Sequence, residues 1–380
     1  MNLFNVYPLF DIEPVRGEDA YVYDKNNTQY LDLYGGHAVI SIGHSHPHYV
    51  WKIIEQLNKI GFYSNSVKIP IQQELAEKLG ELSTYEDYSL FLCNSGAEAI
   101  ENALKMASFH NGRKRVVAMK GAFHGRTSLA VACTDNPSIN AEINKVHDVV
   151  FTELNDTEAL TNAVTDEVCA VIIEGMQGFG GVRVPSEQFL KTARQLCDKT
   201  GAVLILDEIQ SGFGRSGKFF THQHSDIQAD IISMAKGMGN GFPIAGILLS
   251  PKFEAKHGML GTTFGGNYLA CAASIAVLDV LKEENLIENA QKIGNYLMES
   301  LAKIKGIKEV RGLGLMIGIE LFDNCAPTRL ELLHKHHIFT GSSSDKNTLR
   351  ILPPLCINKT QADRFLYALN SVLQKSAAAS

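Results

Sequence analysis

The sequence lacks several features, and each absence excludes a class of protein. None of its 380 residues belongs to a run approaching the roughly 18 apolar residues that a membrane-spanning helix needs. The N-terminus has no basic stretch followed by a long apolar one, as a secretory signal would. No block of Lys and Arg stands out and the net charge is -6, which argues against nucleic acid or an anionic membrane as a partner. We therefore expect a cytoplasmic protein with no nucleic-acid or membrane partner.

Cysteine pairs and metal-binding clusters are also missing. The seven cysteines are scattered, odd in number and mostly set in apolar runs, which is typical of reduced core residues in an intracellular protein. His44, His46 and His48 stand at alternate positions, but Pro47 breaks a strand there and no carboxylate or cysteine completes a metal site. We expect no metal, and a loop that leads into a helix over 47–60.

What the sequence does have is a series of short apolar runs separated by helical stretches. Hydrophobic residues make up 45% of the chain, enough for a large core. The runs lie at 90–93, 115–121, 169–178, 202–210 and 243–250, and a helical stretch at 186–199 is typical of those between them. Alternating strands and helices predict an α/β fold with a mainly parallel sheet covered on both faces.

The two ends of the chain differ from this middle part. Around a turn at 24–27, residues 20–33 carry the alternating pattern of a β-hairpin. A long helical region at 268–304, broken near Glu284, precedes a smaller α/β unit. The elements of that unit are strands near 312–321, 337–341 and 348–354 and helices near 326–336 and 360–374. We expect three parts: 1–50, a segment and hairpin that pack with the small domain; 51–280, the large domain; and 281–380, the small domain.

Polar residues gather where the apolar runs end. They are His124 and Arg126 after the run at 115–121, Glu174 and Gln177 after the next, and Asp207, Glu208 and Gln210 after the third. Ligands of such sheets bind beyond the carboxyl ends of the strands, so we expect one shared site. Ser95 and Glu98 have capping-box spacing, which predicts a helix that starts near Gly96 with free N–H groups for an anion.

Lys236 closes another apolar run and is followed by glycines at 237, 239 and 241. A lysine in a partly dry pocket has a lowered pKa and becomes a nucleophile toward carbonyl groups. The stretch GFGRSG at 212–217 matches the G-x-G-x-x-G dinucleotide fingerprint. However, Asp207 and Glu208 would repel a pyrophosphate, and no apolar-striped helix follows. We interpret this stretch as a loop. The alternative that the protein is a NAD-linked oxidoreductase is supported by this stretch alone.

Five motifs together point to a known family. They are NSGAEA (94–99), FHGRT (123–127), LDEIQSGFGR (206–215), AKGMGNG (235–241) and TTFGGN (262–267). In this order they closely resemble the class III (ornithine-type) aminotransferases, which use pyridoxal 5'-phosphate, and especially the acetylornithine aminotransferase branch. The resemblance covers nearly the whole chain. It implies the fold type I of pyridoxal-phosphate-dependent transferases, with a mostly parallel seven-stranded sheet in the large domain, a smaller α/β domain, and a homodimer with active sites at its interface.

The resemblance also implies roles for single residues around the cofactor. Lys236 would hold pyridoxal phosphate as a Schiff base and then move the substrate proton, and Asp207 would keep the pyridine nitrogen protonated. The other implied cofactor-binding residues are Phe123 and Ile209 on the two ring faces, Gln210 near the ring hydroxyl, His124, the phosphate turn of Ser95, Gly96 and Ala97, and Thr263 from the neighbouring subunit. Ala97 replaces a common threonine, so we expect weaker cofactor binding at that turn.

On the substrate side, the resemblance implies that Arg126 binds a carboxylate and that Thr262 lies close by. Taken alone, Arg126 could equally pair with a structural carboxylate. Relatives often have a glutamate where Phe179 stands, and that glutamate can neutralise a second arginine, here Arg350. We hypothesise that Arg350 therefore stays available for an anionic acyl group or 2-oxoglutarate, which would favour N2-succinylornithine. His37 replaces an aliphatic residue; it could bond an acyl group or be an interface histidine.

The resemblance implies a transaminase of arginine biosynthesis that moves the δ-amino group of N2-acetyl-L-ornithine or N2-succinyl-L-ornithine to 2-oxoglutarate, forming glutamate. Close alternatives are an ornithine, 4-aminobutyrate or catabolic succinylornithine aminotransferase. A non-catalytic binding protein with the same fold is an alternative of another class, and the presence of Lys236, Asp207 and Arg126 speaks against it.

Overall fold

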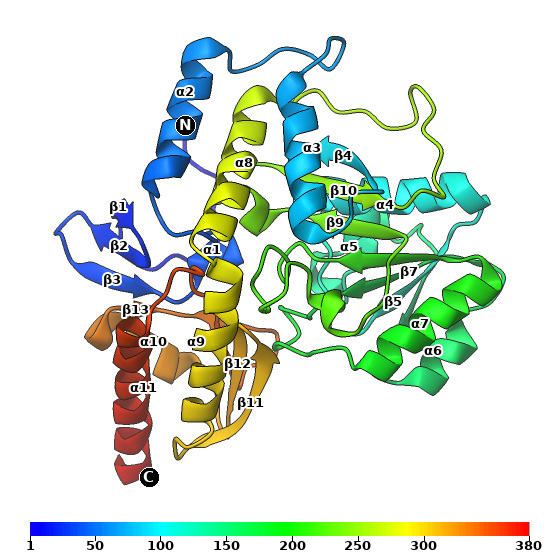
Figure 1. The fold of residues 1–380 in the computed structure, drawn as a ribbon. Coiled ribbons are helices and arrows are strands. Elements are labelled where there is room, and N and C mark those ends of the chain that lie inside the picture. Colours follow the sequence, from blue (N-terminus) through cyan, green and yellow to red (C-terminus); the bar gives the residue numbers. More distant parts are fainter. Residues whose placement is uncertain (380) are drawn as a thin grey trace.

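A computed structural model describes residues 1–379, and its largest element is a seven-stranded sheet in the order β4-β10-β9-β8-β7-β5-β6 (Figure 1). The strands are β4 (Ser89–Cys93), β5 (Arg115–Met119), β6 (Val149–Thr152), β7 (Val168–Glu174), β8 (Val203–Asp207), β9 (Ile231–Met234) and β10 (Ala245–Leu249). β10 is antiparallel to both neighbours, and the pairs from β9 to β6 are parallel. The expected fold class, with a mostly parallel seven-stranded sheet, is confirmed.

Helices cover both faces of this sheet (Figure 1). The helices of this part of the chain are α2 (Pro47–Lys59), α3 (Pro70–Ser83), α4 (Gly96–Asn111), α5 (Ser128–Ala132), α6 (Thr157–Ala163), α7 (Glu187–Thr200) and α8 (Tyr268–Glu283). On β7, Ala170 and Ile172 belong to the core that contains α4, whereas Val171 and Ile173 belong to the core that contains α7. Because both faces are buried, the strand shows a continuous apolar run instead of alternation.

Two smaller sheets lie beside the large one. The first has the order β1-β2-β3-β13 and the second β11-β12-β15-β14. Their elements are β1 (Pro14–Glu18), β2 (Tyr21–Asp24), β3 (Gln29–Asp32), β11 (Ile307–Leu313), β12 (Met316–Leu321), β13 (Ile338–Phe339), β14 (Gly341–Ser342) and β15 (Thr348–Ile351), with helices α9 (Leu286–Leu301), α10 (Ala326–His336) and α11 (Lys359–Ala379). β13 pairs in parallel with β3, so the N-terminal hairpin shares a sheet with the C-terminal part of the chain.

Some elements were not predicted from the sequence. The apolar run at 312–321 is not one strand but part of the antiparallel pair β11 and β12, which turn at Gly314. β11 carries charged residues on an edge of its sheet, so its sequence lacks an apolar run, and the same holds for the exposed edge strand β1. β6 is short and only partly buried. The predicted break in the long helix is confirmed, with Asn285 between α8 and α9 in the left-handed region (φ 52°).

The GFGRSG stretch is a loop, as predicted, and it connects two parts of the molecule. Its arginine, Arg215, is almost fully buried and donates hydrogen bonds to the carbonyl oxygens of Leu315 (3.0 Å) and Pro353 (2.8 Å). Burial lowers the pKa of the Arg215 guanidinium to about 10, although the charge of Asp32 opposes this. The loop therefore holds the C-terminal sheet against the large one. Short 3-10 turns complete the chain: Pro137–Ile139, Glu142–Asn144, Thr221–His224 and η4 (Lys236–Met238).

Candidate active site

A cavity of about 440 Å³ opens at the carboxyl ends of β5, β7, β8 and β9. This is where ligands bind in open α/β sheets. Most of the residues singled out from the sequence line it: Ser95, Gly96, Ala97, Phe123, His124, Arg126, Asp207, Ile209, Gln210 and Lys236. The others do not line it, and they are His37, Phe179, Thr262, Thr263 and Arg350.

Lys236 begins the short helix η4, two residues after β9 ends. Its φ of 45° places a non-glycine residue in the left-handed region, a strained conformation that often marks a functional position. Burial lowers the pKa of its amine, although the charges of Asp207 and Glu174 oppose this. Within residues 1–379 its amine has no hydrogen-bond or ion-pair partner. The amine is therefore available as a nucleophile or base.

Asp207 ends β8 and is buried beside His124. The Oδ2 atom of Asp207 lies 2.7 Å from Nδ1 of His124, and its Oδ1 atom accepts a hydrogen bond from the backbone N–H of Ile209 (3.0 Å). Because a carboxylate only accepts, Nδ1 of His124 carries the proton. The other ring nitrogen of His124, Nε2, is buried and has no partner in the described part of the chain. The carboxylate is thus fixed in place before any ligand binds.

The start of α4 presents free backbone N–H groups to the cavity. Ser95 is the N-cap, and its side chain accepts a hydrogen bond from the N–H of Glu98 (3.3 Å). The Glu98 carboxylate accepts a hydrogen bond from the N–H of Asn94 (2.9 Å). This donor stands one residue before the N-cap, so the predicted capping box is shifted by one residue. The N–H groups of Gly96 and Ala97 lie in the first turn, at the positive end of the helix dipole. Such a turn binds phosphate readily.

Phe123, which lines the cavity, packs against the tilted ring of Phe179, with ring centroids 5.7 Å apart. The loop that carries Phe179 is tied to the C-terminal part of the chain, because its carbonyl oxygen accepts a hydrogen bond from the N–H of Ser344 (2.9 Å). On another wall, Ile209 packs against the start of α4, where a Cβ atom at Gly96 would lie 3.0 Å from its Cδ1 atom. The glycine leaves room for this contact.

Arg350 on β15 reaches the cavity through Gln210. It is 4% exposed, donates to the carbonyl of Ser342 (2.6 Å), and its Nη1 lies 3.4 Å from Oε1 of Gln210. Gln210 in turn donates to the carbonyl of His37 (3.1 Å). Burial lowers the pKa of Arg350. Among the described residues no carboxylate forms an ion pair with Arg350, although it is buried, so its charge is uncompensated.

His37 lies in a left-handed turn, α1 (Gly35–Ala38), next to Tyr34. The Tyr34 hydroxyl lies 2.5 Å and 2.7 Å from the two ring nitrogens of His37. Partial burial, and then the positive charges of Arg350, Lys236 and Arg329, lower the pKa of His37 to about 4. His37 is therefore a neutral hydrogen-bonding group near neutral pH. The tyrosine stands only three residues before His37, but it was not singled out from the sequence, because the contact depends on the left-handed turn that joins them.

Arg126 lines the cavity with an exposed side chain and has no ion-pair partner in the part of the chain that the structure describes. Thr262 lies in a neighbouring hollow beside α3 and β4. Its hydroxyl oxygen accepts a hydrogen bond from Nδ2 of Asn94 (3.2 Å), a residue that does line the cavity. Thr263 is exposed at the surface. The two threonines therefore do not meet the cavity of their own chain directly.

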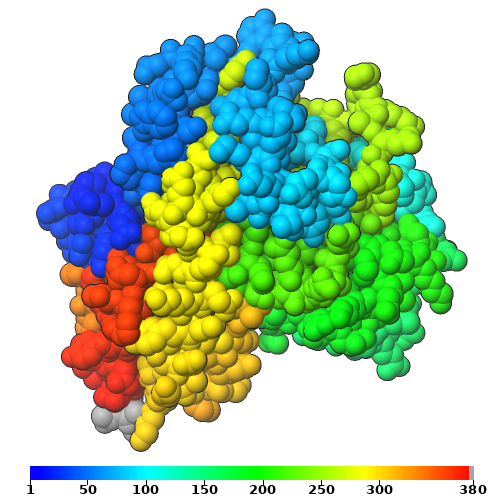
Figure 2. Space-filling model, in the orientation of Figure 1, coloured from blue at the N-terminus to red at the C-terminus, as the bar shows by residue number. Residues whose placement is uncertain are grey.

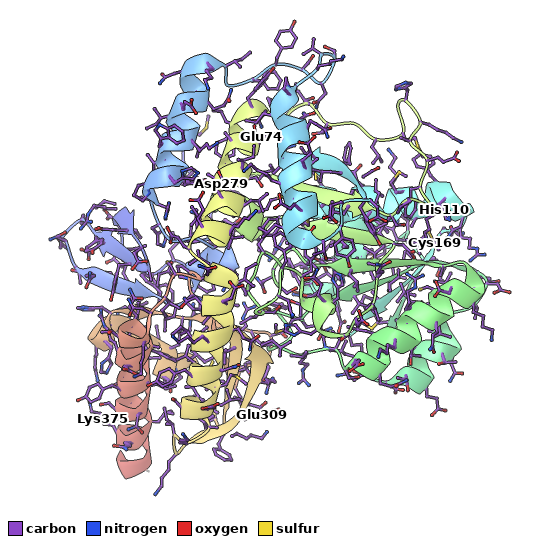
Figure 3. All side chains as sticks on the ribbon, in the orientation of Figure 1. Glu74, His110, Cys169, Asp279, Glu309 and Lys375 are labelled. Atoms are coloured by element: carbon purple, nitrogen blue, oxygen red, sulfur yellow. The ribbon has the colours of Figure 1, made fainter. Side chains whose placement is uncertain are left out.

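The three alternating histidines each contact a different carboxylate. The contacts are His44–Asp32 (2.8 Å), His46–Glu284 (2.8 Å) and His48–Asp279 (3.0 Å). Asp279, labelled in Figure 3, lies on α8 and also pairs with Lys78 of α3 (2.7 Å). The histidines thus link the start of α2 to other elements. Within residues 1–379, no three His, Cys, Asp or Glu residues are grouped to hold a metal ion.

Glu174 also lines the cavity, and it is the clearest site residue to which the sequence assigned no role. It is 5% exposed, and burial raises its pKa to about 7; His124 lowers that value and Asp207 raises it. Its position was visible in the sequence, since it ends an apolar run as Asp207 does. Its raised pKa was not visible in the sequence, because that shift follows from burial and from the lack of an ion-paired cation within residues 1–379.

The family model "Aminotransferase class-III" matches residues 5–373. The chain belongs to the class III aminotransferases. Its membership confirms the resemblance inferred from the five motifs, and makes the protein a pyridoxal-phosphate-dependent transaminase. Within residues 1–379, none of this aminotransferase's helices combines the length and apolarity needed to cross a membrane.

Relatives of this aminotransferase carry related names. The acetylornithine aminotransferase of Archaeoglobus fulgidus is 41% identical over 352 residues, which is 92% of each chain. A putative [LysW]-aminoadipate semialdehyde/glutamate semialdehyde transaminase of Pyrococcus furiosus is 39% identical and covers 94% of this chain and 95% of its own.

Solved structures agree with the fold. Ornithine aminotransferase from Toxoplasma gondii matches with a TM-score of 0.92 at 27% identity, covering 100% of this chain and 94% of its own. Acetylornithine aminotransferase from Elizabethkingia anophelis matches with a TM-score of 0.85 at 30% identity, covering 98% and 96%.

Pyridoxal 5'-phosphate is the cofactor of this aminotransferase, and the cavity fits it. The amine of Lys236 has no partner within residues 1–379 and suits an aldehyde. The fixed carboxylate of Asp207 suits a protonated ring nitrogen, and the free N–H groups at the start of α4 suit a phosphate. Phe123 and Ile209 both line the cavity, and their apolar side chains suit an aromatic ring.

The environment of His37 leads to a pH prediction. We expect its imidazole to titrate near pH 4, because partial burial and three nearby positive charges disfavour the protonated form. The unfolded chain binds this proton more tightly, so the contribution of His37 to folding stability decreases as the pH falls from 6.5 toward 4. The test is an NMR titration of the histidine signals, with His37→Gln assigning the resonance. A midpoint near 6.5 would contradict the prediction.

Proposed function

We propose that this aminotransferase transfers the δ-amino group of an N2-acylornithine to 2-oxoglutarate, as a step of arginine biosynthesis in the cytoplasm. The observation that carries this proposal is the cavity itself. The partly buried amine of Lys236, which has no partner within residues 1–379, lies in the same cavity as the fixed carboxylate of Asp207. Arg126 and Arg350, which have no carboxylate partner among these residues, lie in the cavity or next to it. The name of the Archaeoglobus fulgidus relative supports the acylornithine substrate.

In this proposal the protein does three things around the cofactor. Lys236 holds it covalently and, once displaced, carries the proton between the substrate carbon and the cofactor. Asp207, fixed by His124, keeps the ring nitrogen protonated. The first turn of α4, with Ala97, binds the phosphate. When bound, pyridoxal phosphate supplies an electron sink that stabilises negative charge on the substrate carbon. Phe123, Ile209 and Gln210 position the ring.

The arginines distinguish the two substrates. Arg126 binds the carboxylate of 2-oxoglutarate or of the amino donor with its planar fork. Arg350 meets the anionic end of the acyl group, or the second carboxylate of 2-oxoglutarate, and Phe179 leaves that charge unneutralised. His37 offers a neutral hydrogen bond to the acyl amide. These assignments favour N2-succinylornithine over N2-acetylornithine as donor.

We also propose a homodimer in which Thr262 and Thr263 complete the cavity of the other subunit. The apolar face of α2 supports this, because none of its residues is buried and Trp51, Ile54 and Leu57 are largely exposed. In Figure 2, α2 lies at the surface of the molecule. The same proposal divides the chain into 1–50, the large cofactor-binding domain 51–280 and the small domain 281–380.

The covalent role of Lys236 is tested by trapping. Borohydride reduction of the holoenzyme followed by peptide mapping is expected to place the pyridoxyl group on the peptide that contains Lys236. Lys236→Ala is expected to lower kcat at least about a thousandfold, because the proton-transferring amine is lost. Lys120→Ala is the matched control, since that lysine follows β5 but forms a surface ion pair with Glu153. A pyridoxyl group on any other lysine would refute the assignment.

The donor preference is tested by steady-state kinetics with N2-succinylornithine, N2-acetylornithine and ornithine. We expect the highest kcat/KM with N2-succinylornithine. In Arg350→Met this preference is expected to fall by about ten- to a hundredfold, because a hydrogen bond between charged groups is lost. Arg183→Met serves as control, since Arg183 is exposed and its side chain donates a hydrogen bond to the carbonyl of Gly180, away from the cavity. A wide preference for N2-acetylornithine in the unaltered enzyme would contradict the proposed preference for N2-succinylornithine.

The shared cavity is tested by hybrid dimers. Lys236→Ala alone and Thr263→Glu alone are both expected to be inactive, the second because its carboxylate repels the phosphate. After the two variants are unfolded together and refolded, one site in each hybrid combines an intact Lys236 with an intact Thr263. About a quarter of the unaltered activity should return if the subunits mix randomly. No recovery, with mixed dimers verified by mass spectrometry, would show that Thr263 does not act across the interface.

A further inference from the structure

Glu174 is a buried carboxyl group that has no role in the steps proposed above. It stands opposite Asp207 in the register of the parallel strands β7 and β8. Directly opposed residues in neighbouring strands point to the same face of a sheet, so the two carboxyl groups are neighbours, and both line the cavity. Two carboxylates in one buried place are not readily ionised together.

Glu208 shows what a buried carboxylate of this protein needs in order to stay charged. It is fully buried, and it accepts hydrogen bonds from the backbone N–H (3.0 Å) and Nδ1 (2.8 Å) of His222 and from a serine hydroxyl. These contacts hold its pKa below the usual value, against the effect of burial. Glu174 accepts only from the N–H groups of Phe123 (3.2 Å) and Gly178 (3.3 Å). No cation of residues 1–379 lies within ion-pair distance of it.

The charged groups that act on Glu174 come from four elements. They are His124 after β5, Asp207 on β8, Lys236 on η4 and Arg350 on β15. His124 already serves Asp207, and Arg350 is held by Ser342 and Gln210. Burial raises the pKa of Glu174 to about 7, so its proton is exchangeable near neutral pH. A negative charge on Glu174 also raises the pKa of Lys236.

We propose that Glu174 is a positioning residue that holds a proton beside Asp207 and thereby controls how readily Lys236 gives up its own proton. With Glu174 neutral, Asp207 is the main negative charge near the amine, and Lys236 is more easily deprotonated. With Glu174 ionised, the amine holds its proton more tightly. The same carboxyl group joins the loop of Phe123 to the loop that begins at Gly178. The inference rests on the proposed function, which gives Lys236 the proton transfer.

The first test is the pH profile of kcat. In E174Q the side chain keeps its size but cannot ionise. The acidic limb of the kcat profile, which reports deprotonation of Lys236, is therefore expected to move to lower pH by about one unit. Glu174→Asp, which can still ionise, should restore part of the difference. Glu101→Gln is the matched control, because Glu101 also accepts from two backbone N–H groups, those of Leu129 (2.8 Å) and Ala130 (3.1 Å), but lies outside the cavity. A purely structural role would lower kcat without moving the limb.

The second test does not depend on turnover. Infrared difference spectra of the holoenzyme should contain the band of a protonated carboxylic acid that disappears as the pH rises through about 7 and is absent from E174Q. Absence of this band from the unaltered enzyme, or a limb that stays in place in E174Q, overturns the inference. If the unaltered enzyme transaminates no acylornithine, the proposed function fails, and the infrared titration still decides whether Glu174 holds the proton.

Discussion

The parallel alignment of β5, β7, β8 and β9 is the constraint on which the rest of the site depends. Parallel strands end at the same edge of a sheet, so the residues that follow them meet although they are far apart in the chain. His124, Glu174, Asp207 and Lys236 arrive in this way from four segments. The sheet is buried on both faces, which keeps these charged groups in a region of low dielectric, where each one affects the protonation of the others.

Charged groups at this edge fall into two kinds. Glu208 and Asp207 have fixed hydrogen-bond partners, and the network around Glu208 and His222 supports the turn that carries Ile209 and Gln210. Lys236, Arg350 and Glu174 have no opposite charge within ion-pair distance among the described residues. Burying such groups lowers stability, and they persist in proteins mainly where function uses them. The second kind therefore marks the places where cofactor, substrate or an exchangeable proton belongs.

The residues to which we assign substrate selection lie partly outside the large sheet. The N-terminal turn with His37 and the C-terminal strand with Arg350 contact Gln210 directly, and Phe179 packs against Phe123. The carbonyl of Phe179 is held by Ser344, so a movement of the C-terminal sheet would move this loop as well. In the function that we propose, the large sheet positions the cofactor ring, whereas the choice of acyl group depends on segments that contact the small sheets.

The sequence by itself determined the mainly parallel sheet, the helix start at Gly96 and the cluster around Lys236. These depend on local patterns: apolar runs of strand length, a capping serine, and polar residues at the ends of runs. The tertiary structure alone decided the pairing of β3 with β13 and the partners of the three alternating histidines. It also decided that Glu174 and Glu208, both buried acids after apolar strands, differ in protonation. The reason is that pKa values and edge-strand pairing depend on neighbours distant in sequence, and no local pattern records them.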